Sequence, residues 1–124
     1  MQRFLLVCGA GGLGSGARYL VSLWAGEKLG DEFPWGTLIV NVVGSFLIAL
    51  ILEMTLRKAM SPELSLTLAT GFMGGFTTYS AFNYQTTALA SSGHVDRAVI
   101  NVVVTLAGCL VAGLAGAWLA RRIA

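Results

Sequence analysis

At residues 70–82 the chain reads Thr-Gly-Phe-Met-Gly-Gly-Phe-Thr-Thr-Tyr-Ser-Ala-Phe. Three glycines and a run of hydroxyl side chains therefore lie inside an apolar segment, about residues 62–90, that is long enough to cross a membrane. Backbone at membrane depth leaves the helical pattern only where protein or a water-filled path covers it. In transporters and channels, such broken helices supply carbonyl oxygens and helix ends as ion ligands. The sequence predicts that the helix breaks here, near the middle of the membrane, at a site that handles an ion.

The composition of the whole chain is that of a membrane protein. Its 124 residues are 56% hydrophobic and only 11% charged, and the mean hydropathy is +0.76. Four apolar segments, at about residues 4–24, 36–56, 62–90 and 97–119, use up most of residues 1–124. We therefore predict one all-α domain of four membrane spans in a lipid bilayer. The net charge of +2 is too small and scattered to indicate nucleic-acid binding.

The first span is rich in small residues. Gly12 and Gly16 form a GxxxG pair, which predicts close approach of another helix. Arg18 follows within about two turns of the apolar centre. Two interpretations of Arg18 stay open: its side chain reaches out to the membrane surface, or protein groups hold it near an ion path.

Polar residues recur at i, i+4 and i+8 on one face of the second span and on one face of the fourth. An amide inside a span needs hydrogen-bond partners, so Asn41 is the most informative of them. Its NH₂ group offers two donors, either to an anion or to a neighbouring carbonyl as a structural bond between helices. The two stripes consist of Thr37, Asn41 and Ser45 in the second span, and of Asn101, Thr105 and Cys109 in the fourth.

The third span has a predicted helix start, and its second half contains both polar and aromatic side chains. Ser61-Pro62-Glu63 provides a capping hydroxyl, a proline and an early acid, which predict a helix start. Beyond the expected break, Thr78, Phe82 and Gln85 share a face, with Tyr79 beside Phe82. Aromatics at this spacing often form only a packing stripe, but the hydroxyls among them favour an ion path. For the last helix, Asp96 is the predicted cap.

At these residues the sequence resembles the Fluc/CrcB family of fluoride channels. The resemblance covers three blocks, residues 14–19, 36–44 and 70–82, and extends over all four spans. It implies passive, electrogenic fluoride efflux that lowers cytoplasmic fluoride across a bacterial inner membrane. It further implies an antiparallel, dual-topology homodimer with two fluoride pores and a structural Na⁺ at the dimer interface.

The resemblance also assigns roles to individual residues. Backbone carbonyls of Gly74 and Thr77 would bind the Na⁺, and Asn41 matches a pore asparagine. Phe82 matches the second phenylalanine of an aromatic pair, and Tyr79 stands in place of the first. The predicted fluoride pore consists of Asn41, Thr78, Tyr79, Ser80, Phe82, Thr105 and Cys109, and the residues predicted around it or at its vestibule are Arg18, Thr37, Ser45, Gln85 and Asn101.

Some positions depart from the family pattern. Tyr79 adds a hydroxyl where the family has a bare ring edge, Ala81 removes a hydroxyl, and Gln85 stands where a glutamate is frequent. Cys109 falls where many members have serine. These departures bear on the pore ligands more than on the family resemblance.

Other protein classes fit the sequence less well. A small multidrug antiporter needs a carboxylate within the membrane, but the first span has none and Glu53 lies near the end of the second. A scaffold protein would explain the glycines but not Asn41 and the hydroxyl run together. An enzyme is not expected, because the spans contain no cluster of His, Cys, Asp and Glu. Of the eight basic residues, five lie on the side of the two termini, a bias that favours cytoplasmic termini only modestly.

Overall fold

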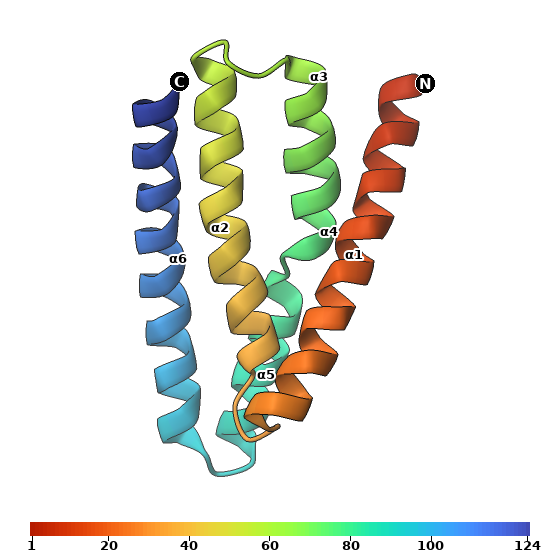
Figure 1. Ribbon diagram of the computed structural model, residues 1–124. Helices are drawn as coiled ribbons and strands as arrows, with labels where there is room; N and C mark the ends of the chain where they lie inside the picture. Colours follow the sequence, from red (N-terminus) through yellow and green to blue (C-terminus); the bar gives the residue numbers. More distant parts are fainter.

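The computed structural model describes residues 1–124 and contains only helices and turns. Both termini lie at one end of the molecule together with the turn between α2 and α3, and the other two turns lie at the opposite end (Figure 1). Three helices, α1, α2 and α6, are long and apolar enough to cross a membrane. The helices are α1 (Gln2–Leu29), α2 (Trp35–Leu56), α3 (Pro62–Ser65), the π-helix η1 (Leu66–Met73), α4 (Gly74–Phe76), α5 (Tyr79–Ser91) and α6 (Val95–Ile123).

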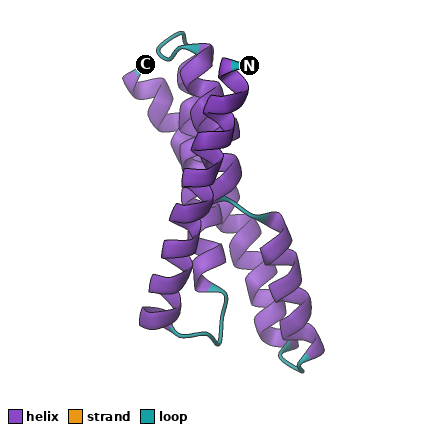
Figure 2. Cartoon of the chain, turned by 90° about the vertical axis from the view of Figure 1, so that its right-hand side faces the viewer, coloured by secondary structure: helices purple, strands orange, loops and turns teal.

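The segment expected to be the third span is two helical runs in the structure. The first run, α3–η1–α4, starts where the sequence predicts it, since Ser61 Oγ accepts a hydrogen bond of 3.2 Å from Leu64 N–H. Its middle is a π-helix, a wide-turned form that the sequence does not predict. The run ends at Phe76, and α5 starts at Tyr79. A non-helical segment joins two helices near mid-height in Figure 2.

The interruption consists of Thr77 and Thr78, which have extended backbone. The glycines before it, Gly71, Gly74 and Gly75, remain helical. The glycines therefore do not break the helix themselves. Two of them have a packing role instead, because they lie against α1.

Helix α1 packs against the first run with backbone touching backbone. A Cβ added at Gly14 would lie 2.0 Å from the carbonyl oxygen of Phe72, and one added at Gly75 would lie 2.1 Å from that of Gly11. Gly12 and Gly16 have no atom within 4 Å of an added Cβ. The expectation that the Gly12–Gly16 pair packs against another helix is therefore wrong within this chain. Their face of α1 points away from the bundle, and Gly14 carries the contact.

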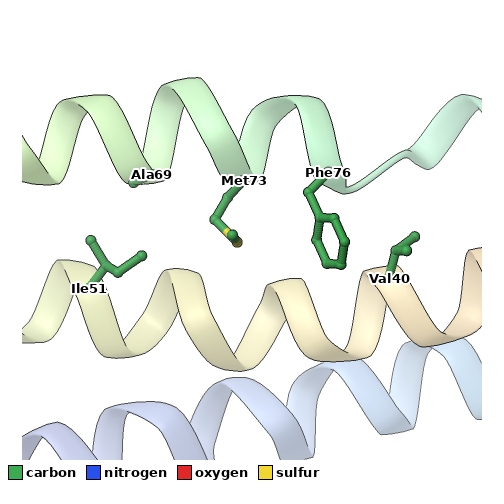
Figure 3. Close-up of a cluster of buried hydrophobic side chains, with 5 residues drawn as sticks. All are labelled: Val40, Ile51, Ala69, Met73 and Phe76. Carbon is green, nitrogen blue, oxygen red and sulfur yellow. The ribbon is translucent and has the colours of Figure 1, made fainter. Parts of the chain in front are cut away.

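The apolar core lies between α2 and the α3–η1–α4 run. Figure 3 shows side chains of the two segments facing each other. Helix α6 packs on α2, where a Cβ added at Gly116 would lie 2.2 Å from the carbonyl oxygen of Phe46. The core cluster consists of Val40, Ile51, Ala69, Met73 and Phe76.

The last helix starts differently from the prediction. Helix α6 begins at Val95, so Asp96 lies inside its first turn and caps nothing. A carboxylate in this position still interacts favourably with the helix dipole. Asp96 as the N-cap is therefore a wrong prediction, because the N-cap position is His94, two residues earlier.

Candidate functional site

The interruption in the third segment is held by Asn41 of α2. Its Nδ2 donates to the carbonyl oxygen of Thr78 at 3.0 Å, and its Oδ1 accepts from the N–H of Thr78 at 2.8 Å. One amide side chain therefore satisfies both backbone groups of an extended residue, which water would satisfy in a soluble protein. The structural interpretation of Asn41, a bond to a neighbouring backbone, is thus realised. The second hydrogen on Nδ2 remains available to another acceptor.

The same bond leaves the end of the first helical run open. In a continuous helix, the N–H of Thr78 would bond to the carbonyl of Gly74 four residues earlier, but here it bonds to Asn41. The carbonyl of Gly74 therefore lacks its helical donor. Gly74 is also exposed. A carbonyl without a donor at an exposed helix end is a suitable cation ligand.

Helix α5 starts at the same point with the opposite polarity. Thr78 caps it, since its Oγ1 accepts from Ala81 N–H at 3.2 Å, and the same oxygen lies 3.2 Å from Ser80 Oγ. The N-terminus of a 13-residue helix carries a partial positive charge. The interruption thus places carbonyl oxygens and a positive helix end a few residues apart.

A hollow of about 430 Å³ opens beside the interruption, between α2, α5 and α6. We call it the pore groove. Six of the seven predicted pore residues line this groove, all except Ser80. The lining also includes Ser45, which was predicted near the pore, and Thr77, which was predicted as a Na⁺ ligand. Its lining is Asn41, Gly44, Ser45, Ile48, Thr77, Thr78, Tyr79, Phe82, Thr105, Leu106, Cys109 and Leu110.

The aromatic pair of the pore groove is asymmetric. The ring centroids of Tyr79 and Phe82 lie 5.7 Å apart at an interplanar angle of 52°. Phe82 is buried, whereas Tyr79 is 75% exposed. Phe82 therefore has a fixed position inside the chain, and the Tyr79 ring faces outward from it.

A chain of hydrogen bonds extends from Phe82 to α6. Thr86 Oγ1 donates to the carbonyl of Phe82 at 2.7 Å and accepts from Asn101 Nδ2 at 2.8 Å. Asn101 Oδ1 accepts from Thr105 Oγ1 at 3.4 Å. Asn101 is thus a buried residue that links α6 to α5 by hydrogen bonds. It lies beside the pore groove and not in its lining. Thr86 was missed in the sequence, although its position one turn after Phe82 was a usable signal.

Two of the predicted vestibule residues lie in a separate hollow. Thr37 and Gln85 line a cavity of about 460 Å³ towards the turn between α1 and α2. The Oε1 atom of Gln85 is buried there with no hydrogen-bond partner in the chain. Arg18 is half-buried on α1 and makes no hydrogen bond or ion pair within the chain. The structure therefore does not bring Arg18 together with the pore groove.

Thr77, the second predicted Na⁺ ligand, is tied into the interruption. Its Oγ1 donates to the Met73 carbonyl at 2.9 Å, and a Cβ added at Gly44 would lie 2.1 Å from its Cγ2. Its hydroxyl and methyl groups are thus both engaged within the chain, and the group of Thr77 predicted to bind the cation is its backbone carbonyl. A hard cation takes about six oxygens, so Gly74 and Thr77 of one chain fit a Na⁺ only as part of a larger set.

Glu53, the carboxylate that a multidrug antiporter would need, already forms ion pairs with arginines. Glu53 Oε1 accepts from Arg57 Nε at 3.2 Å and from Arg121 Nε at 3.0 Å. Its side chain is 18% exposed and lies at the end of α2, away from the pore groove. Glu53 ties α2 to α6 and does not face a path through the bundle.

Comparison with known proteins gives matches over the full chain. The family model described as "CrcB-like protein, Camphor Resistance (CrcB)" matches residues 5–117. A protein of Anaeromyxobacter sp. (strain K) named "Fluoride-specific ion channel FluC" is 54% identical over 100% of this chain and 99% of its own length. Proteins of the same name from Geobacter sulfurreducens and Thermus thermophilus are 46% and 45% identical, each over 99% of this chain and over 100% and 94% of their own lengths.

Proposed function

The chain belongs to the CrcB family, and from that premise we propose that it is a fluoride-selective ion channel. The family is one of ion channels and not of enzymes, and the chain is a multi-pass membrane protein. The proposed activity is passive, electrogenic fluoride efflux through a bacterial inner membrane, which would lower cytoplasmic fluoride. The observation that carries the proposal is the pore groove beside an interruption that Asn41 holds open.

The groove offers the chemistry that a small, strongly hydrated anion needs. Such an ion enters a pore only if donors replace its water without trapping it. The donors available in the groove are the second N–H of Asn41 and the hydroxyl of Thr78. The Thr78 hydroxyl lies 3.2 Å from Ser80 Oγ, outside the lining, and can turn from it to an anion. The hydroxyls of Ser45 and Thr105 already donate to carbonyl or amide oxygens. They would contribute only if fluoride displaced those bonds.

Two further features favour anion passage at this point. The N-terminus of α5 faces the groove at Thr78 and Tyr79, and helix N-termini attract negative charge. The ring edge of Phe82 carries positive quadrupole density, which gives a weak contact that releases easily. Together they would hold fluoride loosely between its donors.

A second copy of the chain is the partner that the exposed face of α5 fits. Polar residues inside a predicted span lie exposed on this face, and lipid cannot satisfy their hydrogen bonds. Tyr79 and Tyr84 are 75% and 73% exposed. We propose that a homodimer covers this face and that each copy supplies one of two pores. The face consists of Tyr79, Ser80, Asn83, Tyr84 and Thr87.

The antiparallel arrangement of that dimer is also part of the proposal. Five basic residues belong to the end that holds the termini: Arg3 at the start of α1, Arg57 and Lys58 in the turn after α2, and Arg121 and Arg122 at the end of α6. Lys28 and Arg97 belong to the opposite end, and Arg18 lies near the middle of α1. A bias this weak permits insertion in both orientations. Dual topology would then bring the two interruptions face to face.

A structural Na⁺ between the two copies is consistent with the helix end at Gly74. When bound, the ion would supply fixed positive charge in a low-dielectric region. The carbonyls of Gly74 and Thr77 would hold it, and two copies would double the number of oxygens. For the cation to bind, these carbonyls must have no helical donors. Asn41 ensures this for Gly74, because it binds the Thr78 N–H that would otherwise donate to the Gly74 carbonyl.

Fluoride efflux from liposomes tests the proposed function. With valinomycin and K⁺ carrying the compensating charge, a fluoride electrode should record rapid efflux, while chloride stays inside. Phe82→Leu should slow fluoride efflux by about three- to tenfold, the value of one aromatic contact. Phe72→Leu is the matched control, because Phe72 stacks on Phe76 and lies outside the pore groove. A folded protein without valinomycin-dependent fluoride efflux would overturn the proposal.

Removal of Na⁺ tests the structural ion. Protein purified and reconstituted with N-methyl-D-glucamine in place of Na⁺ should lose fluoride efflux and regain it when Na⁺ returns. K⁺ and valinomycin are kept the same in both samples, so the driving force does not change. Equal efflux rates in the two samples would contradict a structural role for Na⁺ and would leave the channel proposal intact.

A further inference from the structure

An apolar groove runs along the α2–α6 pair, separate from the pore groove. It consists of two hollows, of about 560 Å³ and about 460 Å³, which share Leu29, Trp35, Leu38 and Val104. The second hollow has an entirely hydrophobic lining. Neither shares a residue with the pore groove. We call this feature the lipid groove, because its apolar lining suits an acyl chain.

The polar side chains of the lipid groove gather at one mouth. Arg97 Nη2 donates to Glu32 Oε2 at 3.2 Å, and Arg97 Nη1 donates to the Glu32 carbonyl at 3.3 Å. The guanidinium has five N–H donors, so three remain for another acceptor. The Glu32 side chain is 84% exposed and that of Arg97 36% exposed. An exposed pair of this kind is weak enough to open and admit a competing charge.

The mouth lies at the level where lipid headgroups are expected. Phe33 and Trp35 pack against each other there, with ring centroids 4.9 Å apart. Trp35 lines both hollows and is 39% exposed. Aromatic side chains at the ends of membrane spans mark the headgroup region. The charged pair therefore lies at the level expected for headgroups, and the apolar part of the groove lies at the level expected for acyl chains.

We propose that the lipid groove binds one phospholipid with a zwitterionic, primary-amine headgroup of the phosphatidylethanolamine type. One acyl chain lies along Leu38, Val42 and Val104, the phosphate bonds to Arg97, and the ammonium bonds to Glu32. The adjacent positive and negative groups complement this headgroup. A purely anionic headgroup would meet the Glu32 carboxylate, and a quaternary ammonium has no N–H to donate to it.

Native mass spectrometry of the purified protein can test this proposal. The full chain is equilibrated with equal amounts of phosphatidylethanolamine, phosphatidylcholine and phosphatidylglycerol that carry the same acyl chains. The wild-type protein should retain the ethanolamine lipid over the other two by about threefold, the effect of one exposed ion pair. Lys28→Gln is the matched control, because Lys28 lies at the same end and lines neither hollow.

The variants separate headgroup from chain recognition. Glu32→Gln should abolish the preference for the ethanolamine lipid over the choline lipid. Arg97→Gln should lower retention of all three lipids. Val104→Trp should fill the groove and also lower retention of all three lipids. Size-exclusion chromatography confirms that each variant is folded. Equal retention of the three lipids by the wild type, or a preference for phosphatidylglycerol, would overturn the proposal. So would loss of the dimer in Val104→Trp, because a second copy would then be the occupant of the groove.

Discussion

Replacing Asn41 by leucine is expected to abolish fluoride efflux. The substitution keeps the size of the side chain and removes both hydrogen bonds to the backbone of Thr78. Each backbone group left without a partner costs about 1–3 kcal/mol. Thr78 N–H regains a backbone partner if the helix closes onto the Gly74 carbonyl, which removes the interruption. Since about 1.4 kcal/mol corresponds to a factor of ten, we expect the efflux rate to fall more than about 30-fold.

The measurement is valinomycin-dependent fluoride efflux, compared between variants of equal reconstitution yield. Thr55→Ala is the control: Thr55 also lies in α2 and bonds to the Ile51 carbonyl at 2.8 Å, but far from the interruption. Asn41→Asp keeps the acceptor for Thr78 N–H and loses the donor to its carbonyl, so it should also be inactive while remaining folded. If Asn41→Leu conducts at half the wild-type rate or more, Asn41 does not hold the pore.

The sequence predicts the polar surfaces of this fold better than the contacts between them. The i, i+4, i+8 stripes of α2 and α6 do supply Asn41, Ser45, Thr105 and Cys109 to one groove. Helical periodicity fixes which side chains share a face, so such a stripe can be recognised without a structure. The start of the third segment at Ser61 was also predictable from local sequence, because a capping hydroxyl followed by proline marks a helix start.

The contacts that hold the interruption are not local. Asn41 and Thr78 are separated by 37 residues, and no periodicity indicates which backbone group an amide will meet. The glycines drew attention to the correct stretch, but the helix breaks after them, at Thr77 and Thr78. A glycine run in a membrane helix indicates either a break or close packing, and only the position of α1 decides between the two.

The interruption would also explain how one short chain could serve the two proposed ions, which have opposite charge. Breaking a helix creates a carbonyl end and an N–H end at the same place, and each carries about half an elementary charge. Gly74 belongs to the first end, and Thr78 caps the second. Asn41 binds both backbone groups of Thr78 and so keeps the Thr78 N–H from the Gly74 carbonyl. A proposed cation site and a proposed anion path therefore depend on a single side chain.

Gly14→Ala should destabilise the protein far more than Gly12→Ala or Gly16→Ala. All three glycines lie in α1 and within four residues of one another. A Cβ at Gly14 would lie 2.0 Å from the Phe72 carbonyl oxygen and 3.0 Å from the backbone nitrogen of Phe76, whereas Gly12 and Gly16 have open space. Backbone atoms cannot move aside as a side chain can, so α1 must separate from the α3–η1–α4 run. We expect a cost of about 3 kcal/mol, the upper range for overpacking.

The readout is the temperature at which the purified protein loses its monodisperse size-exclusion peak. Gly14→Ala should lower this temperature by about 10 °C or more. Gly12→Ala and Gly16→Ala should leave it unchanged or raise it, because alanine favours a helix over glycine by about 1 kcal/mol. The GxxxG pattern taken alone predicts the reverse order, with Gly12 and Gly16 as the sensitive positions. If that reverse order is observed, the outward face of α1 is a packing surface in the assembled protein, and its partner must be another chain.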